Sequence, residues 1–157
     1  MAVRVAINGF GRIGRNVLRS ILEYGRDDIE IVSINDLGPV ETNAHLLKYD
    51  SVHGTLPMDV SVDGDTIKVG GQSFKVTAIR DPKELPHGEN NVDIAMECTG
   101  IFASRDKAAM HLENGSKLLV SSRSPSRGQR LSCPLLKGGG RIIVSNTIRE
   151  CCFWSDN

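Results

Sequence analysis

The feature that most constrains the fold of this chain is the segment Gly9–Gly14, whose sequence GFGRIG has the spacing G-x-G-x-x-G. It directly follows residues 2–8, where apolar and polar side chains alternate as in a β-strand. It opens residues 11–23, whose apolar side chains recur with the period of a helix. A second strand is expected over residues 29–35. Together these segments predict a βαβ unit with two parallel strands and a right-handed crossover.

Each glycine of this segment has its own predicted role in a dinucleotide-binding turn. Gly9 allows a sharp turn, Gly11 lets a pyrophosphate approach the backbone, and Gly14 lets the helix pack closely on the strand. The first N–H groups of the helix and the positive end of its dipole stabilise such an anion. A glycine-rich turn without a ligand is the alternative, but the position between a strand and a helix favours nucleotide binding.

An acidic residue follows the second expected strand at the position that a dinucleotide-binding unit requires. Asp36 lies 22 residues after Gly14, directly after the segment IVSIN. A carboxylate at this place accepts hydrogen bonds from the ribose hydroxyls of adenosine and repels a 2′-phosphate. The sequence therefore predicts NAD rather than NADP as the cofactor.

The α/β pattern continues to residue 121. A short helix, a run of strands with tight turns, a buried strand, a helix capped by Ser104 and a final strand are expected in turn. The strands joined by tight turns are expected to form a hairpin insertion outside the parallel core. The predicted fold class is α/β, a Rossmann doubly wound, mostly parallel sheet with a small antiparallel hairpin insertion. The expected ranges are 40–48, 59–79 with turns at Asp63-Gly64 and Gly70-Gly71, 91–97, 105–113 and 117–121.

The charge of the chain changes sharply along its length. Residues 1–116 hold 12 Lys and Arg against 17 Asp and Glu, whereas residues 117–157 hold 7 against 2. Beyond Ser121 no period is sustained, although a strand is expected over 141–146. The tail lacks the interleaved aromatic residues that would favour nucleic-acid binding. The predicted domains are therefore a dinucleotide-binding domain, residues 1–121, and an atypical, partly disordered tail, residues 122–157.

The remaining chemistry-bearing residues favour ordinary structural roles. The cysteines lack the spacing of a disulfide framework or metal site, so reduced thiols and no metal are expected. Cys98 adjoins a buried strand and is expected to be a small core residue. Cys151 and Cys152 have no visible base to activate them. His45 and His53 have no motif partner, and structural or interface roles are expected for them.

The sequence shows no segment that would direct the chain to a membrane. No stretch approaches the about 20 apolar residues of a membrane span. The first residues lack the apolar core and cleavage site of a signal peptide. We therefore expect a cytoplasmic protein with neither membrane nor nucleic-acid partners.

Several segments resemble glyceraldehyde-3-phosphate dehydrogenase, in particular the bacterial, NAD-using type. Erythrose-4-phosphate dehydrogenase has a similar N-terminal half and is an alternative. The resemblance implies that residues 2–121 are the NAD-binding half of such an enzyme. The segments are INGFGRIGR (7–15), IND (34–36), HLLKYDSVHG (45–54), RDP (80–82) and ECTGIF (97–102).

The resemblance also implies where NAD binds. It implies no catalytic residue and no metal ligand in this chain. The implied contacts are Gly9, Gly11, Arg12, Ile13 and Gly14 at the pyrophosphate turn, Asn8, Asp36 and Leu37 near the adenosine ribose, Arg80 near the adenine, Thr99, Gly100 and Phe102 along the adenine and ribose pocket, and Ser121 near the nicotinamide.

The chain departs from the family pattern after Ser121. Members of the family usually continue with Ala-Pro, where this chain has Ser122-Arg123. Arg149 stands where the nucleophilic cysteine of the family's Ser-Asn-Ala-Ser-Cys-Thr-Thr-Asn segment is expected. The family oxidises an aldehyde to an acyl phosphate by hydride transfer to NAD, and its members are homotetramers. This chain is expected to bind NAD at best, not to catalyse, and to associate through apolar surface that the missing parts would cover.

Two further interpretations stay open at this point. The chain is either a binding or regulatory module, for example one that inserts into oligomers of a full-length paralogue, or a frame-shifted product. In the second case the tail beyond residue 117 is not selected to fold. Its Arg-, Ser- and Cys-rich composition favours the frame-shifted product over a designed tail.

Overall fold

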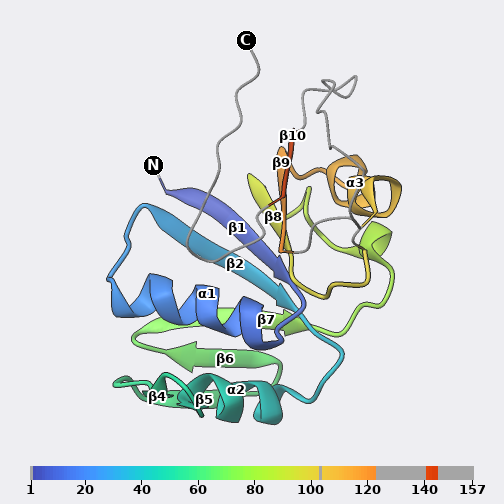
Figure 1. Ribbon diagram of the computed structural model, residues 1–157. Coiled ribbons are helices and arrows are strands. Elements are labelled where there is room, and N and C mark those ends of the chain that lie inside the picture. The colour runs from blue at the N-terminus through green and yellow to red at the C-terminus, as the bar shows by residue number, and fades with distance from the viewer. Residues whose placement is uncertain (1, 103, 123–140, 145–157) are drawn as a thin grey trace.

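The computed structural model describes residues 2–102, 104–122 and 141–144, and these residues form one eight-stranded sheet and one separate strand pair (Figure 1). The order of the large sheet is β10-β9-β8-β1-β2-β7-β6-β5. Neighbours from β10 to β7 are parallel, and neighbours from β7 to β5 are antiparallel. The strands are β1 (Val3–Asn8), β2 (Ile29–Asn35), β5 (Val60–Asp63), β6 (Thr66–Val69), β7 (Gln72–Thr77), β8 (Ile94–Glu97), β9 (Leu118–Ser121) and β10 (Arg141–Val144).

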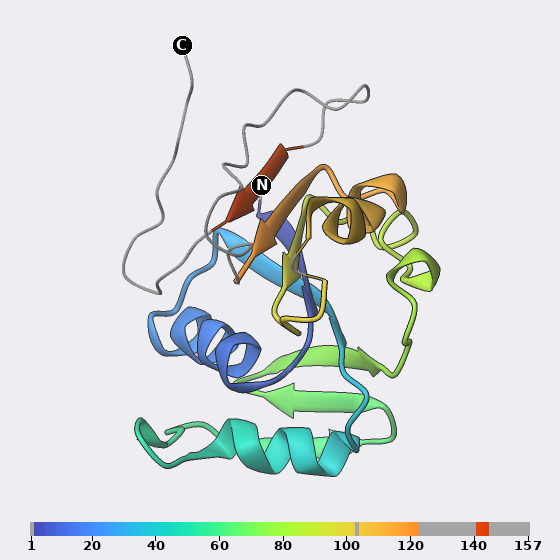
Figure 2. The ribbon, with the colours of Figure 1, turned by 45° about the vertical axis from the view of Figure 1, so that its right-hand side comes forward.

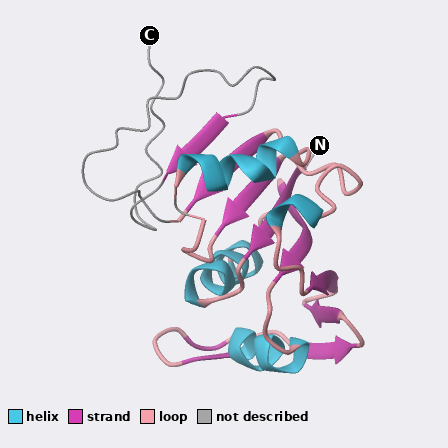
Figure 3. Ribbon diagram, turned by 90° about the vertical axis from the view of Figure 1, so that its right-hand side faces the viewer, coloured by secondary structure: helices cyan, strands magenta, loops and turns pink. Residues whose placement is uncertain are grey.

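Helices cover both faces of the sheet (Figure 2). The chain runs from β1 to β2 in one direction and from β8 to β9 in the other. Right-handed crossovers therefore place α1 (Arg12–Glu23) and α3 (Arg105–Glu113) on opposite faces. Leu18 of α1 belongs to the large core cluster under β1 and β2, whereas Ala108 of α3 packs with Leu119 of β9. Figure 3 shows α3 lying across the strands on the viewer's side.

The end of α1 shows how the local sequence fixes an element. Leu18, Ile21 and Leu22 face the core and are at most 8% exposed, and burial of each stabilises the fold by about 1.5–3 kcal/mol. Gly25 has a φ of +59°, and its N–H donates to the carbonyl of Leu22 at 3.2 Å. The Arg26 N–H donates to the carbonyl of Ile21 at 3.1 Å, which completes a Schellman motif and stops the helix.

Most elements expected from the sequence are present, and the α/β fold class with a mostly parallel sheet is confirmed. Strand β2 and helices α2 (Val40–Lys48) and α3 have the expected bounds. Strand β7 differs from the expectation, because it does not lie outside the parallel core: it pairs in parallel with β2. Ser104 stands at the N-cap of α3, but its side chain makes no capping hydrogen bond.

Two short features carry no periodic signal and were not expected. They are the strand pair formed by β3 (Tyr49–Asp50) and β4 (Gly54–Thr55), and a 3₁₀ helix over Pro82–Glu84. Each is too short for a hydrophobic period to be recognised. The 3₁₀ helix begins after Asp81, whose carboxylate accepts a hydrogen bond from the Lys83 N–H at 3.0 Å.

The order in which successive strands are added to the sheet reverses at β1, because β2 lies on one side of β1 and β8 on the other. The boundary between β1 and β8 is therefore a topological switch point. The two strands are parallel neighbours, with Asn8 opposite Glu97. In open α/β sheets, ligands bind outside the carboxyl ends of the strands at such a point. The fold therefore locates the candidate site at the carboxyl ends of β1, β2 and β8.

Candidate functional site

The glycine turn after β1 is shaped by two glycines and left open at the third. Gly9 has a φ of +92°, and a Cβ built on it would lie 2.6 Å from the backbone nitrogen of Thr99. A Cβ on Gly14 would collide with the carbonyl oxygen of Gly9, so α1 packs directly on the turn. A Cβ on Gly11 would meet no atom within 4 Å. The turn is therefore open to a ligand at Gly11.

The N-terminus of α1 meets this open side. Gly11 is the N-cap, and its carbonyl accepts the first helical hydrogen bond from Arg15 N–H at 3.0 Å. Among the described residues, no side chain caps this end and no acidic residue stands in the first turn. The first N–H groups of α1 and the positive end of its dipole can therefore stabilise an anion.

Asp36 is tied to the same turn by its carboxylate. One oxygen, Oδ2, accepts a hydrogen bond from the Phe10 N–H at 2.7 Å. The other, Oδ1, accepts from the Gly38 N–H at 2.8 Å and lies 3.4 Å from Nδ2 of Asn43. Leu37, the next residue, is 56% exposed. The acid is thus held beside the glycine turn, and its remaining lone pairs can accept further hydrogen bonds.

Arg12 is the first residue of α1, and its side chain contacts residues of the β3–β4 strand pair. Its guanidinium lies 3.4 Å from Oδ2 of Asp50 and 3.3 Å from Oγ of Ser51. Hydrogen bonds from the backbone of His53 and Val52, at 2.9 and 2.8 Å, lower the pKa of Asp50 to about 2. Asp50 is therefore ionised near neutral pH, and it keeps the exposed Arg12 at this edge.

The turn after β8 forms the other side of the candidate site. Thr99 packs against Gly9, and its Oγ1 accepts a hydrogen bond from the Ile101 N–H at 3.1 Å. Gly100 has a φ of +73°, and Phe102 is half-buried. Of the other expected site residues, Ile13 is half-buried in the first turn of α1, Arg80 is exposed beyond β7, and Ser121 is buried at the end of β9.

The side chain of Asn8, expected near the ribose, is turned into the protein. The residue is 3% exposed. Its Nδ2 donates to Oε2 of Glu97 at 2.6 Å, and its Oδ1 accepts from Nδ2 of Asn35 at 2.8 Å. The amide therefore belongs to a buried network rather than to the open edge.

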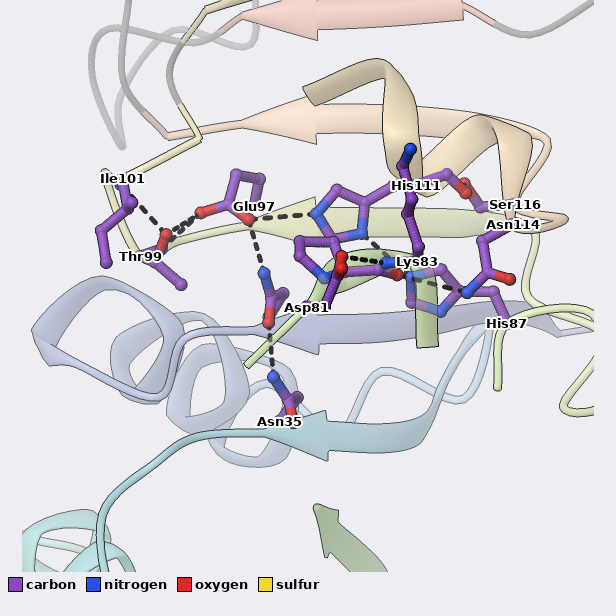
Figure 4. Close-up of polar contacts among 12 residues, drawn as sticks. Asn35, Asp81, Lys83, His87, Glu97, Thr99, Ile101, His111, Asn114 and Ser116 are labelled. Carbon is purple, nitrogen blue, oxygen red and sulfur yellow. Dashed lines mark hydrogen bonds and ion pairs between the residues drawn. The ribbon is translucent and has the colours of Figure 1, made fainter. Parts of the chain in front are cut away.

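The buried network centred on Glu97 is the feature that the sequence did not suggest (Figure 4). Glu97 is 1% exposed, and its Oε2 also lies 3.1 Å from Nε2 of His111. Nδ1 of His111 lies 3.0 Å from Nε2 of His87. A buried carboxylate followed by Thr-Gly, with a histidine on the next helix, is the only signal that the sequence offered.

The protonation states of this network follow from its surroundings. Burial would raise the pKa of Glu97, but hydrogen bonds from His111, Thr99 and Asn8 outweigh it and hold the pKa below its usual value. Burial, together with the nearby His111, lowers the pKa of His87 to about 4. Glu97 is therefore ionised and His87 neutral near neutral pH.

The other residues singled out in the sequence take structural positions. Burial, with a smaller effect of the Glu97 charge, raises the pKa of Cys98 to about 12, so its thiol is protonated and fits the expected core role. The ring of His45 contacts the ring of Tyr49, with 4.9 Å between centroids. Arg149, Cys151 and Cys152 lie outside the described residues.

The described part of the chain was found to hold neither a cluster of metal-binding side chains nor a membrane-spanning helix. Residues 2–102, 104–122 and 141–144 contain no group of three or more His, Cys, Asp or Glu side chains that could hold a metal ion. None of the helices in these ranges has the length and apolar character needed to cross a bilayer.

Comparison with known proteins gives a single family. Residues 3–105 match the family described as glyceraldehyde 3-phosphate dehydrogenase, NAD binding domain. The chain is 66% identical over 132 residues to a glyceraldehyde-3-phosphate dehydrogenase of Xanthobacter flavus, covering 84% of this chain and 39% of that protein. Identity to the enzyme of Cereibacter sphaeroides is 64% over 122 residues, covering 78% of this chain and 36% of that protein.

A more distant relative gives the same result. Identity to the Geobacillus stearothermophilus enzyme is 52% over 132 residues, covering 84% of this chain and 38% of that protein. The chain thus spans less than half the length of these relatives. The family match covers the glycine turn, Asp36 and the turn after β8, so the chain belongs to the glyceraldehyde-3-phosphate dehydrogenase family and carries its NAD-binding domain.

Proposed function

We propose that this chain binds NAD across the carboxyl ends of β1, β2 and β8, with the pyrophosphate at the N-terminus of α1. The fit of the site to this group rests on the open turn, where the space beside Gly11 would admit a phosphate. The contacts proposed are Gly9, Gly11, Arg12, Ile13 and Gly14 around the pyrophosphate, Asp36 and Leu37 at the adenosine ribose, Arg80, Thr99, Gly100 and Phe102 around the adenine, and Ser121 towards the nicotinamide. Asn8 contributes by holding Glu97.

The observation that carries this proposal is the contrast between Gly11 and its two neighbours in the motif. Gly9 and Gly14 are required by the fold itself, because a Cβ on either would collide with backbone atoms. Gly11 has no such reason, since its φ of −68° suits any residue and the space beside it is open. A glycine that the fold does not need, facing the N-terminus of a helix, is explained by a ligand that approaches the backbone.

A matched pair of substitutions tests the proposal. Gly11→Ala adds a methyl group where the pyrophosphate would lie, and we expect a loss of NAD affinity of about tenfold or more by calorimetry. Gly88→Ala is the control: it adds the same group away from the site, where the nearest atom would be 3.8 Å away. Equal affinities in both variants and the unaltered chain would contradict the proposed site.

For the activity of the whole protein, the proposal rests on the names of the relatives. Glyceraldehyde-3-phosphate dehydrogenases have the activity that their name states, and the proposed role of this chain is the cofactor half of that reaction. Bound NAD supplies a nicotinamide that accepts a hydride. The residues of this chain bind and orient the dinucleotide: α1 stabilises its phosphates and Asp36 fixes its ribose. Homotetramer formation and a cytoplasmic location stay predictions.

The isolated 157-residue chain is expected not to turn over an aldehyde, since its sequence has no counterpart of the family's cysteine segment. The assay is NADH formation from glyceraldehyde-3-phosphate, phosphate and NAD, with chain purified from a host that lacks its own enzyme. Activity that persists there, and disappears in the double variant Cys151→Ser, Cys152→Ser, would make the tail catalytic.

A further inference from the structure

The network around Glu97 joins the two turns that flank the proposed NAD site. Its members come from β1, β2, β8 and α3, from the segment before β8 that carries His87 and from the turn after β8 that carries Thr99, and all except Thr99 are at most 7% exposed (Figure 4). In so buried a network each donor must face an acceptor, because an unmatched polar group is costly. Which atom donates and which accepts can therefore be deduced along the network, starting from a backbone N–H, which only donates, and a carbonyl, which only accepts.

The assignment of donors and acceptors starts at the backbone of Ile79. Its backbone N–H, which can only donate, lies 2.8 Å from Oδ1 of Asn35, and its carbonyl, which can only accept, lies 2.8 Å from Nδ2 of Asn35. The orientation of the Asn35 amide is thereby fixed. Nδ2 of Asn35 donates to Oδ1 of Asn8, so Nδ2 of Asn8 must donate to Oε2 of Glu97.

The other oxygen of Glu97 also faces donors only. Oε1 accepts a hydrogen bond from the Thr99 N–H at 2.8 Å. It also contacts Oγ1 of Thr99, which accepts from the Ile101 N–H and donates its own proton to Glu97, because the ionised carboxylate can only accept. Both oxygens thus have to accept, which a carboxylate does and an amide of the same shape cannot.

The two histidines continue the same series of hydrogen bonds from donor to acceptor. Oε2 of Glu97 accepts from Nε2 of His111, so that nitrogen carries a proton. With His111 as a neutral imidazole, which has one donor and one acceptor, Nδ1 of His111 accepts from Nε2–H of His87. Nδ1 of His87 is then bare, and it is buried without a partner among the described residues. Both histidines are assigned the Nε2–H form.

We propose that Glu97 is a positioning residue, whose carboxylate holds the Thr99–Ile101 turn against the Gly9 turn in the geometry that NAD requires. The proposal rests on the proposed function. Thr99 is bound to Glu97 through its N–H and its hydroxyl, and the same Thr99 backbone would lie 2.6 Å from a Cβ on Gly9. Through Asn8, the carboxylate also holds the end of β1 just before that turn.

The substitution Glu97→Gln tests this role, since it preserves shape but turns one acceptor into a donor. In the cofactor-free chain we expect the backbone amide signals of Thr99 and Ile101 to shift in ¹H–¹⁵N spectra. NAD affinity is expected to fall by about tenfold to a hundredfold, the range for a hydrogen bond to a charged group. The matched control Glu113→Gln makes the same chemical change at the exposed end of α3 and should alter neither.

The outcomes separate this proposal from the proposed function. Unchanged Thr99 and Ile101 signals in the folded Glu97→Gln chain would overturn the positioning role even if the unaltered chain failed to bind NAD. Equal NAD affinity in the Glu97→Gln and Glu113→Gln chains would overturn it as well. If Glu97→Gln does not fold, long-range ¹H–¹⁵N imidazole spectra of the unaltered chain decide: the Nε2–H form at His111 and His87 supports the network, and an Nδ1–H form at His111 overturns it.

Discussion

At the scale of single residues, the carboxylate of Asp36 is placed for two tasks. It binds the Phe10 N–H and so fixes the glycine turn, and it stands where the ribose of a dinucleotide is expected. Because both tasks need an acceptor at the same place, we propose that the acid that shapes the phosphate turn also selects the cofactor.

The selection of NAD over NADP should therefore depend on the Asp36 charge. A 2′-phosphate beside this carboxylate meets like-charge repulsion and partial desolvation, worth about 1–3 kcal/mol. We expect Asp36→Asn to reduce the ratio of the NADP to the NAD dissociation constant by a corresponding factor, measured by calorimetry. The exposed Asp59→Asn should leave the ratio unchanged, and an unchanged ratio in Asp36→Asn would show that another group selects the cofactor.

His87 makes the stability of the domain depend on pH in a defined window. Burial lowers its folded-state pKa to about 4, whereas the unfolded chain has the ordinary value near 6.5. Between these values the unfolded state binds more protons, so this contribution is present above pH 6.5 and is lost as the pH falls towards 4. The loss amounts to about 3 kcal/mol.

Urea unfolding between pH 7 and pH 4.5 measures this contribution. The unaltered chain should lose more stability over this interval than the variant His87→Gln, whose amide can still donate to His111 but does not titrate. The histidine contribution would be refuted by parallel losses in the two chains. Glu97, with its lowered pKa, adds to the acid sensitivity of both and does not affect the comparison.

At the scale of elements, a buried arginine joins α1 to α2 and to the β3–β4 strand pair. Arg19 is 3% exposed and donates to the carbonyls of Leu47 and Gly54, both at 3.1 Å. It also pairs with Glu23 at 3.3 Å. The arginine therefore satisfies the Leu47 carbonyl in the last turn of α2, where a helix leaves carbonyls without intrahelical partners, and the Gly54 carbonyl of β4.

Arg19→Ala is expected to destabilise the chain by about 2–4 kcal/mol, because one buried and one part-buried carbonyl lose their donor and the stem leaves a cavity. Arg26→Ala is the control, since its pair with Asp28 is exposed on both sides and should matter little. The measurement is the free energy of unfolding from urea titrations. Similar losses in both variants would show that Arg19 does not have this joining role.

The elements also show how far the sequence predicts this structure. Strand 29–35 was predicted with its observed bounds from its apolar run, and helix 105–113 from the capping serine Ser104 before it. The expected helix over 40–48 has its observed bounds as well. The buried role of Arg19 had no such signal. Nor did the contact between Glu97 and His111, which lie 14 residues apart and meet only after β8 and α3 have packed. Among expected site residues, Asn8 was placed near the ribose, yet its side chain completes this network.

At the scale of the whole molecule, the surface carries several large exposed apolar side chains. Tyr49, Val52 and Leu46 are 51%, 73% and 38% exposed, and they lie close in sequence along the end of α2 and the β3–β4 strand pair. Apolar groups gathered in this way are typical of surfaces that associate with other proteins.

We therefore expect the purified chain to associate with itself in sedimentation velocity experiments. The double variant Tyr49→Ser, Val52→Ser should associate less, and Tyr24→Ser, at an even more exposed position beyond α1, serves as the control. A clean monomer at high concentration would show that this surface is compatible with an isolated domain.

The central claim is that NAD lies across the carboxyl ends of β1, β2 and β8, and a titration of ¹⁵N-labelled chain with NAD tests it most directly. The predicted result is a saturable shift of the backbone amide signals from Gly9–Gly14, Asp36–Gly38 and Thr99–Phe102, while signals from β5 and β6 at the far edge of the sheet stay in place. Saturable binding that instead shifts β5 and β6, or no saturable shift at the glycine turn at millimolar NAD, would contradict the account.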